Sequence, residues 1–345
     1  MAVVLAFAAA LWGLGQMMRM PYSARFLMIG LLYIAVLAVN VALPDGHPLR
    51  EATGGSAGEW LLIALVGALV WTYSKGLGAL RQYVRPENRK VDSPDTSGVE
   101  LERNARHIVL REIGGPGQKR LKEARVLVIG AGGLGSPVLQ YLAAAGVGTI
   151  GVIDDDVVDN SNLQRQVIHI DDRIGMPKVF SAEIAMQAQN PFVTIRPYHR
   201  KLTAEIAREL FADYDVILDG TDDVDTRYLV NETAVQLGLP LISAAISQWE
   251  GQISIFDPTR GAPCYACVFP EPAAAGLAPS CAEGGVLGPL PGVVGSMMAA
   301  EAVKLIAGAG EPLLGRMMIY DALYGDVRTI NTKRREDCGV CGKTG

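Results

Sequence analysis

Charged side chains are scarce in this sequence, and their scarcity excludes one class of partner. Lysine, arginine, aspartate and glutamate make up 19% of the 345 residues, and the net charge is −5. Proteins that bind nucleic acids carry concentrated positive charge, so we expect no nucleic acid partner. Hydrophobic residues make up 50% of the chain, and the excess lies towards the N-terminus, which indicates that part of the chain lies in lipid.

Cysteine is also rare, and its distribution argues against a framework of disulfide bonds. Four of the five cysteines form two Cys-x-x-Cys pairs, Cys264 with Cys267 and Cys338 with Cys341, while Cys281 stands alone. Two such pairs can complete a tetrahedral zinc site even with about 70 residues between them. We therefore predict a reducing compartment and a structural zinc (Zn2+) site with four cysteine ligands, with a redox role for the pairs as the alternative.

Three stretches near the N-terminus lack charged side chains altogether. They are residues 1–18, Phe26–Leu43 and Trp60–Ser74. Crossing about 30 Å of hydrocarbon takes roughly 20 apolar residues; the first two stretches nearly reach this length, and the third must extend further. No basic segment precedes the first stretch, which disfavours a cleaved signal peptide, and none has the polar face of a soluble helix. We therefore expect a transmembrane anchor of about three α-helices at residues 1–80.

The loops between these stretches indicate how the anchor is oriented. Arg19 and Arg25 lie in the first loop with no acidic residue, whereas residues 44–59 hold three acidic residues and one arginine. Positive loops face the cytoplasm, so we expect a multi-pass protein of the bacterial inner membrane whose N-terminus is outside. A polar linker is predicted at 81–98, followed by one cytoplasmic domain at 99–345.

The segment from residue 125 to residue 154 has the order of a nucleotide-binding unit. The β-branched run Arg125–Ile129 is typical of a buried parallel strand, and the glycine-rich stretch Gly130–Gly135 follows it directly. A helix is predicted next, and a second strand at Thr149–Ile153 ends on Asp154. Such glycines let the backbone approach a phosphate, and such an acid accepts from ribose hydroxyls. The sequence therefore predicts a Rossmann-like α/β domain with a mostly parallel sheet.

Charged residues beyond this unit favour a triphosphate over a nicotinamide dinucleotide. Arg165 and Lys178 are candidate phosphate clamps, and Asp222 and Asp223 follow the apolar run Val216–Leu218, at the sheet edge where α/β proteins bind ligands. A triphosphate needs several cations and an acid for magnesium. An NAD-dependent oxidoreductase is the alternative that the glycine stretch alone would permit.

Several motifs occur together and in one order. They are Arg103–His107, the glycine stretch, Ser161–Gln166, Gly175–Lys178, Asp219–Asp223 and the two cysteine pairs. On these motifs the chain, from about Glu100 to Cys341, resembles the HesA/MoeB/ThiF superfamily, whose members are similar to ubiquitin-activating enzymes. Within that superfamily it most resembles the molybdopterin-synthase adenylyltransferases.

The resemblance implies an ATP site and assigns residues to it. The residues implied to bind ATP are Gly130, Gly132, Gly133, Gly135, Asp154, Asp156, Ser161, Asn162, Leu163, Gln164, Arg165, Lys178, Asp222 and Asp223. Asp222 is also implied to bind magnesium (Mg2+), and Arg165 and Lys178 to act in catalysis beside it. Arg106 matches a catalytic arginine that relatives insert into the site of a partner subunit, which implies a homodimer.

Cys281 matches a cysteine that some relatives use as a nucleophile towards their carrier protein. It lies in a stretch rich in glycine, alanine and proline, from which a thiol could reach an acyl-adenylate. A nucleophile and an inert thiol are both compatible with the sequence.

The resemblance implies ATP-dependent adenylation of the C-terminal Gly-Gly carboxylate of a ubiquitin-like sulfur-carrier protein, with release of diphosphate. The expected carrier is the small subunit of molybdopterin synthase. Carriers for thiamine synthesis or tRNA thiolation are alternatives, and so is a non-catalytic membrane scaffold. Longer relatives append a sulfur-carrying domain, whereas this sequence ends at Gly345, so we expect a separate sulfurtransferase as a further partner.

Overall fold

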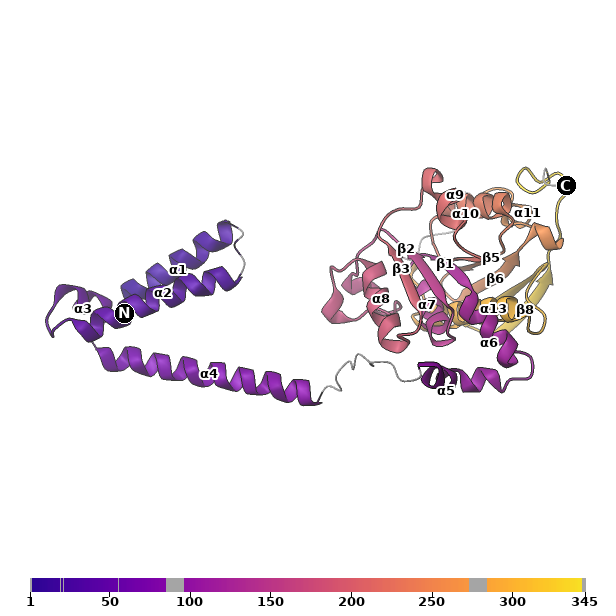
Figure 1. Ribbon diagram of the computed structural model, residues 1–345. Coiled ribbons are helices and arrows are strands. Elements are labelled where there is room, and N and C mark those ends of the chain that lie inside the picture. The colour runs from indigo at the N-terminus through magenta and orange to yellow at the C-terminus, as the bar shows by residue number, and fades with distance from the viewer. Residues whose placement is uncertain are drawn as a thin grey trace. The chain divides into compact units, whose positions relative to one another are not determined.

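The computed structural model describes residues 2–18, 20, 22–54, 56–84, 96–272 and 284–342. The chain divides into two compact units, Met1–Pro94 and Asp95–Gly345 (Figure 1). Each unit has a hydrophobic core of its own. We call them the N-terminal unit and the α/β unit.

The described part of the N-terminal unit is helical throughout. Its helices are α1 (Ala2–Met17), α2 (Tyr22–Ala42), α3 (Pro48–Thr53) and α4 (Ala57–Val84). A small core joins α1, α2 and α4 through the buried side chains of Val4, Val36 and Trp60. Trp60 packs edge-on against Tyr33, with the ring centroids 5.8 Å apart, and its indole N–H donates to the carbonyl of Thr53 at 3.2 Å. The indole therefore has its partner inside the helical bundle.

Many large apolar side chains of this unit point outward. Exposed examples are Val3, Leu5, Phe7, Leu14, Phe26, Leu27, Leu31, Ile34, Val41, Leu61, Leu62, Leu65, Val66 and Leu69. Two stretches of the unit, Ala24–Ala42 and Pro48–Leu69, have mean hydropathies of 2.1 and 1.3 and are long enough to cross a membrane, and Val3–Met17 is a shorter apolar helix. Length and composition therefore permit membrane-spanning helices here.

The linker predicted at 81–98 begins and ends within helices. Helix α4 continues to Val84, and α5 (Thr96–Ile108) begins before residue 98. The sequence at the end of α4 consists of helix-forming residues without proline or glycine, so nothing local ends that helix at residue 81. Residues 85–95 of the linker lie outside the described residues.

The α/β unit is built on one eight-stranded sheet with the order β3-β2-β1-β4-β5-β6-β7-β8. The strands are β1 (Arg125–Ile129), β2 (Thr149–Ile153), β3 (Thr194–Tyr198), β4 (Val216–Asp219), β5 (Leu241–Ile246), β6 (Glu250–Phe256), β7 (Arg316–Asp321) and β8 (Asp326–Asn331). The first five strands are parallel, and β6, β7 and β8 are antiparallel to their neighbours. This confirms the predicted α/β class and its mostly parallel sheet.

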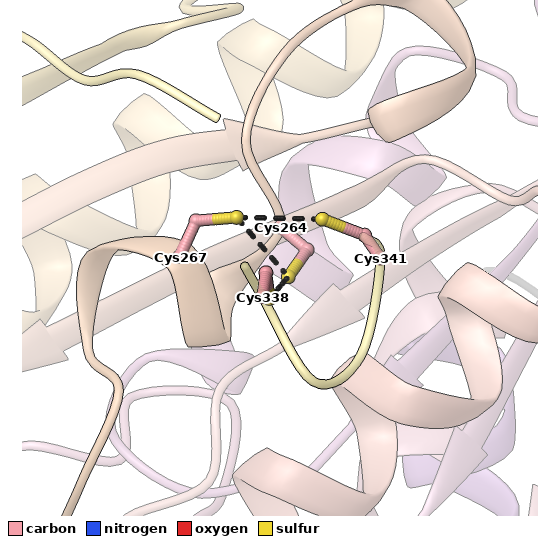
Figure 2. A group of neighbouring side chains, drawn as sticks. All are labelled: Cys264, Cys267, Cys338 and Cys341. Atoms are coloured by element: carbon pink, nitrogen blue, oxygen red, sulfur yellow. Dashed lines mark hydrogen bonds between the residues drawn. The ribbon is translucent and has the colours of Figure 1, made fainter. Parts of the chain in front are cut away.

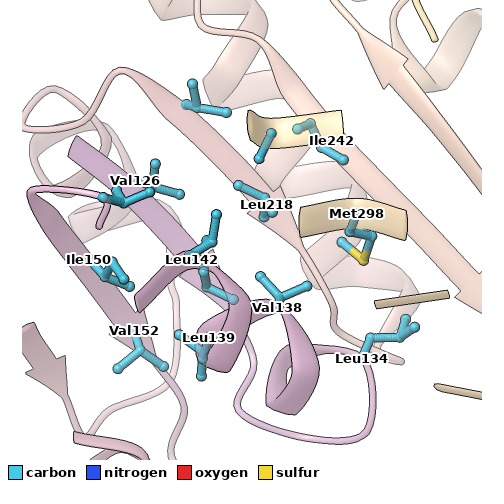
Figure 3. Packing of buried hydrophobic residues seen from close by; sticks show 14 of the residues in the cluster. Val126, Leu134, Val138, Leu139, Leu142, Ile150, Val152, Leu218, Ile242 and Met298 are labelled. Atoms are coloured by element: carbon cyan, nitrogen blue, oxygen red, sulfur yellow. The ribbon is translucent and has the colours of Figure 1, made fainter. Parts of the chain in front are cut away.

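Helices cover both faces of this sheet. One face is covered by α6 (Gly114–Glu123), α7 (Gly135–Ala144), α8 (Lys178–Gln189) and α13 (Pro289–Ala307), and the other by α9 (Ala204–Phe211) and α10 (Val224–Leu237). Strand β1 serves both cores, because Val126 and Val128 face the first while Leu127 and Ile129 face the second. Figure 3 shows the first core, where Met298 of α13 lies near Leu218 and Ile242 of the sheet.

The order of the strands places a crevice beside β1. The chain runs from β1 to β2 and β3 on one side, and then returns to β4 and β5 on the other. The connections that follow β1 and β4 at their carboxyl ends therefore lead to helices on opposite faces of the sheet, α7 and α10. Ligands of α/β proteins bind at such a switch point.

Candidate functional site

The glycine stretch forms a tight turn between β1 and α7. Gly130 has a φ of 91°, a left-handed conformation that favours glycine. A Cβ on Gly135 would lie 2.0 Å from the carbonyl oxygen of Gly130, and a Cβ on Gly130 would lie 3.3 Å from that of Gly220. The loop after β1 is thus pressed against the loop after β4, and only glycine fits at Gly135.

A cavity of about 340 Å3, the main cavity, opens at this switch point. Gly132 and Gly133 of the glycine stretch line it, and so do the charged residues Arg165, Lys178 and Asp222. Its other residues include Leu134, Gln166, Thr221, Val224, Arg227, Tyr228, Ile246, Gln252, Tyr265, Phe269 and Glu271. The main cavity therefore combines charged side chains and the backbone of the glycine stretch with apolar and aromatic residues.

A second cavity of about 300 Å3 lies next to the first, and Thr221 lines both. Gly130, Asp154 and Asp156 belong to it. The carboxylate of Asp154 accepts from the backbone N–H of Ala131 at 2.7 Å and of Asp156 at 2.8 Å. Burial raises the pKa of this carboxyl group, although the nearby ammonium of Lys178 opposes the shift. Asp154 is therefore fixed where β2 ends, beside the glycine loop.

Lys178 is a buried cation at the start of α8. Its ammonium is 2.7 Å from a carboxylate oxygen of Asp156, and only 6% of its side chain is exposed. Charged groups that are buried in proteins are usually paired in this way. Lys178 therefore brings a positive charge into the main cavity while Asp156 lines the second cavity.

The structure separates the predicted ATP-binding residues into those at a cavity and those beside it. Ser161 and Asn162 lie in the short 3-10 helix η1 (Asn160–Asn162), followed by Leu163, and none of these three lines either cavity. Gln164 donates to the carbonyl of Val286 instead, at 3.3 Å. Arg165 lines the main cavity, and its guanidinium donates to the carbonyl of Ser161 at 3.1 Å. The η1 turn therefore supports Arg165.

Asp223 has a structural partner as well as a cavity position. Its carboxylate caps α10 by accepting the backbone N–H of Thr226 at 2.9 Å, and it lines the second cavity. Hydrogen bonds from Thr226 lower the pKa of Asp223. Capping of this kind fixes the first turn of the helix.

Arg106 lies away from both cavities of its own chain. It is exposed on α5, and neither cavity includes it. The preceding part of α5 contacts the loop before β2, since a Cβ on Gly146 would lie 3.2 Å from the amide oxygen of Asn104. That loop is at the amino ends of the parallel strands, whereas the cavities are at their carboxyl ends. Cys281 lies outside the described residues.

The four paired cysteines come together as one buried cluster (Figure 2). The sulfur of Cys264 lies 3.8 Å from that of Cys267 and 3.6 Å from that of Cys338, and Cys267 lies 3.3 Å from Cys341. Four thiolates on a tetrahedral zinc ion, with Zn–S bonds of about 2.3 Å, lie roughly 3.8 Å apart. The backbone N–H of Arg335 also points to the sulfur of Cys267 at 3.4 Å. The donor set is therefore compatible with zinc.

Burial acts on the thiols of this cluster. It raises the pKa of Cys264 and of Cys267, because an anion among apolar groups is poorly solvated. Such thiols ionise when a cation lies among them. The four thiols are buried together, unlike a solvent-exposed redox pair, and are compatible with a metal ion.

Two buried residues at the site were not predicted from the sequence. Gln166 lines the main cavity with 5% exposure, and its amide oxygen has no hydrogen-bond partner among the described residues. His169 bonds through Nε2 to the carbonyl of Ala131 and through Nδ1 to the hydroxyl of Ser181, both at 2.9 Å. Since a carbonyl only accepts, Nε2 carries the proton, and burial lowers the pKa of this imidazole. Gln166 could have been predicted as a site residue because it directly follows Arg165, whereas no neighbouring motif pointed to His169.

The fold and this site define the class of the protein. Residues 104–340 match the ThiF family, and because this match covers more than half of the chain, the protein belongs to that family. The resemblance to the HesA/MoeB/ThiF superfamily is thereby confirmed.

Individual relatives narrow the comparison. The sulfur carrier protein adenylyltransferase of Thermus thermophilus is 50% identical over 247 residues, which are 70% of this chain and 91% of that protein. The probable adenylyltransferase/sulfurtransferase MoeZ of Mycobacterium tuberculosis is 52% identical over 241 residues, covering 69% of this chain and 62% of that protein. A crystal structure of E. coli MccB has a TM-score of 0.61 at 23% identity over 70% of this chain and 71% of that chain, a likeness of fold alone.

Proposed function

We propose that this protein is an adenylyltransferase that activates the C-terminal Gly-Gly carboxylate of a ubiquitin-like sulfur-carrier protein with ATP. The observation that carries the proposal is the main cavity, which Arg165, Lys178 and Asp222 line together with the glycine stretch. Family membership and the names of the relatives support it. The small subunit of molybdopterin synthase is the carrier we favour. The carriers for thiamine synthesis and tRNA thiolation are the alternatives that the experiment below compares with it.

In the proposed reaction the carrier's carboxylate attacks the α-phosphate of ATP, an acyl-adenylate forms, and diphosphate leaves. The protein contributes positioning and stabilisation of charge. Arg165 and Lys178 would hold phosphate oxygens, and Asp154 would hold the ribose. Asp222 would bind a magnesium ion, which uses one or two carboxylates together with phosphate oxygens. The cations Arg165 and Lys178 and the carboxylate of Asp222, which line one cavity with the glycine stretch, suit a magnesium–triphosphate better than a nicotinamide dinucleotide.

The experiment that tests this proposal measures exchange of radiolabelled diphosphate into ATP with each candidate carrier. We expect exchange only with a carrier that has its free Gly-Gly end. Asp222→Ala should lower it by roughly 100-fold or more, whereas Asp225→Ala, an exposed acid three residues along, should leave it unchanged. Absence of exchange with every carrier would refute the proposal, and an active Asp222→Ala enzyme would remove the magnesium assignment.

We also propose that the site is shared between two copies of the chain. Arg106 is exposed and distant from its own cavities, so it would serve the site of the partner. Large apolar side chains that are 40–57% exposed could form the interface: Val157, Val167, Ile170, Ile174, Phe180 and Ile184. An exposed apolar patch on a soluble unit commonly marks such a contact.

Complementation tests the shared site. Arg106→Ala and Asp222→Ala subunits should each be inactive, and mixed dimers should regain one intact site out of two. Random mixing then gives roughly a quarter of the wild-type exchange. Inactive mixtures, in samples where mixed dimers are shown to form, would rule out the shared site.

The cysteine cluster and the N-terminal unit complete the proposal. The cluster would hold a structural zinc ion that fastens the C-terminal segment of the chain to the α/β unit. The N-terminal unit would anchor the enzyme in the bacterial inner membrane with the α/β unit in the cytoplasm, since its described helices expose so many apolar side chains. A separate sulfurtransferase would supply sulfur to the activated carrier. The adenylation step needs no thiol, so Cys281→Ala should retain exchange.

A further inference from the structure

Tyr265 lies in sequence between two cysteines of the cluster and also lines the main cavity. Tyr265 is the first residue of the short helix α11 (Tyr265–Val268), with Cys264 immediately before it and Cys267 two residues later. The same residue lines the main cavity. Any change in the position of α11 therefore reaches both places.

Helix α10 holds Tyr265 at two points. Asn231 accepts the backbone N–H of Tyr265 at 2.8 Å, and the guanidinium of Arg227 lies 5.7 Å from the centre of the Tyr265 ring. Residues four apart lie on the same face of a helix, so one face of α10 fixes both the backbone and the ring. The rings of Tyr228 and Phe269 lie 5.4 Å and 4.8 Å from that of Tyr265, which leaves the ring little freedom to turn.

Arg227 extends this connection to the loop that carries Asp222. Its hydrogen-bond acceptors are the carbonyl of Thr221 (2.5 Å), the hydroxyl of Ser243 (2.9 Å) and the carbonyl of Ala244 (3.0 Å). It also pairs with Asp219, the last residue of β4, at 3.4 Å. Arg227 therefore joins the carboxyl ends of β4 and β5 to the residue next to Asp222.

Burial makes this arrangement rigid. Asp219 is fully buried, and Arg227 is 6% exposed. Removing one partner from a buried ion pair is strongly destabilising, and a network of this kind has one well-satisfied geometry. Tyr265, Arg227 and Thr221, the residue before Asp222, therefore form one continuous line of contacts.

We infer that Tyr265 and Arg227 are positioning residues that couple the cysteine cluster to nucleotide binding in the main cavity. The inference rests on the proposed function, since it takes the nucleotide to be ATP with magnesium at Asp222. Cysteines held around a zinc ion keep α11, and with it Tyr265, in one position against Arg227. Coupling free energies are reciprocal, so nucleotide in the main cavity must also raise the affinity of the cluster for zinc. We expect the higher affinity to appear as slower loss of zinc from the cluster.

The test measures the rate at which the purified, zinc-loaded, full-length protein loses zinc to an excess of a zinc-selective chelator that does not bind magnesium, with and without saturating ATP and magnesium. The wild type should release zinc at least about fivefold more slowly when nucleotide is present, the lower end of typical couplings. In Tyr265→Leu this ratio should fall to about one, and Tyr265→Phe, which keeps the ring, should restore it. Tyr324→Leu is the matched control, because Tyr324 is 82% exposed, and it should keep the wild-type ratio.

A structural role alone would change zinc affinity without changing the effect of nucleotide on release. A wild-type ratio of one would overturn the coupling, and so would a Tyr265→Leu protein that keeps the full ratio, or a purified protein that carries no zinc. If Tyr265→Leu does not fold, Arg227→Lys takes its place, since lysine keeps the charge but cannot reproduce the forked contacts of arginine. It should also bring the ratio to about one.

Carrier-dependent exchange, measured on the same preparations, separates the two ideas. Normal exchange with a zinc-release ratio of one defeats the coupling and leaves the proposed function intact. Nucleotide-dependent zinc release without exchange for any carrier defeats the proposed function and leaves the coupling intact.

Discussion

Helices α2 and α13 are similar in length and apolar composition, but their surroundings differ. Each contains an apolar stretch of 19 residues long enough to cross a membrane, Ala24–Ala42 with a mean hydropathy of 2.1 and Pro289–Ala307 with 1.4. Half of the stretch in α13 is buried inside the α/β unit, against 17% of the stretch in α2. Hydropathy therefore shows that a helix can lie in an apolar environment. The elements packed against it decide whether that environment is a protein core.

The neighbours differ for a physical reason. Helix α13 lies across a sheet, and its Val294, Met298 and Ala302 enter the first core. Helix α2 has only short contact with α1 and α4, where Val36 is buried while Leu31 and Ile34 are exposed. The described helices of the N-terminal unit leave many of their apolar side chains exposed, so those of α2 need another covering. Lipid would supply it.

Deleting residues 1–84 should have the largest effect, because it removes every outward apolar face of the N-terminal unit. We expect the full chain to stay with membranes after washing at high salt and high pH, and the shortened chain to be wholly soluble. Carrier-dependent exchange should remain within about twofold, since every cavity residue lies in the α/β unit. A full-length protein that stays in the soluble fraction would break the comparison between α2 and α13.

Truncating one apolar side chain in each helix should have a smaller and unequal effect. Met298 is fully buried, so Met298→Ala should cost about 2–5 kcal/mol of stability, a fall in the melting temperature of the α/β unit of roughly 4–20 °C. Leu31 is 59% exposed, so Leu31→Ala should change stability by no more than about 0.5 kcal/mol. Calorimetry of both variants in the same detergent measures the difference. Equal shifts would show that α2 is packed as tightly as α13.

The same contrast explains what could be predicted from the sequence. The strands Arg125–Ile129 and Thr149–Ile153 have the predicted bounds, because buried parallel strands are continuous apolar runs and glycine marks their ends. The cluster of Cys264, Cys267, Cys338 and Cys341 was predictable as well, because the spacing of metal ligands reports chemistry that does not depend on the path of the chain between the pairs.

Other parts of the site depend on contacts that a linear pattern does not contain. The positive charge of Lys178 made it predictable as a phosphate-binding residue. Its pairing with Asp156 follows instead from the turn between β2 and α8. Arg227 and His169 act through carbonyl groups far away in sequence. The sequence predicted a role for Arg106 but not its position, because its location at the opposite edge of the sheet is a property of the fold.

Replacing His169 should give the smallest effect, and one that depends on pH. Burial holds the pKa of His169 below its ordinary value of 6.5, so as the pH falls below 6.5 the unfolded chain takes up a proton before the folded one. Stability that is present above pH 6.5 is then lost towards the lowered pKa. His169→Gln keeps a donor for the carbonyl of Ala131 without titrating, so it should lose less stability than the wild type between pH 7.5 and pH 5 in urea unfolding.

Two other effects of pH are controlled in this comparison. The raised pKa of Asp154 acts in the opposite direction but equally in both proteins, and measuring bound zinc at each pH excludes acid release of the metal. Parallel pH profiles would mean that His169 is solvated in solution and that the packing beneath the glycine loop is looser than the core around α13.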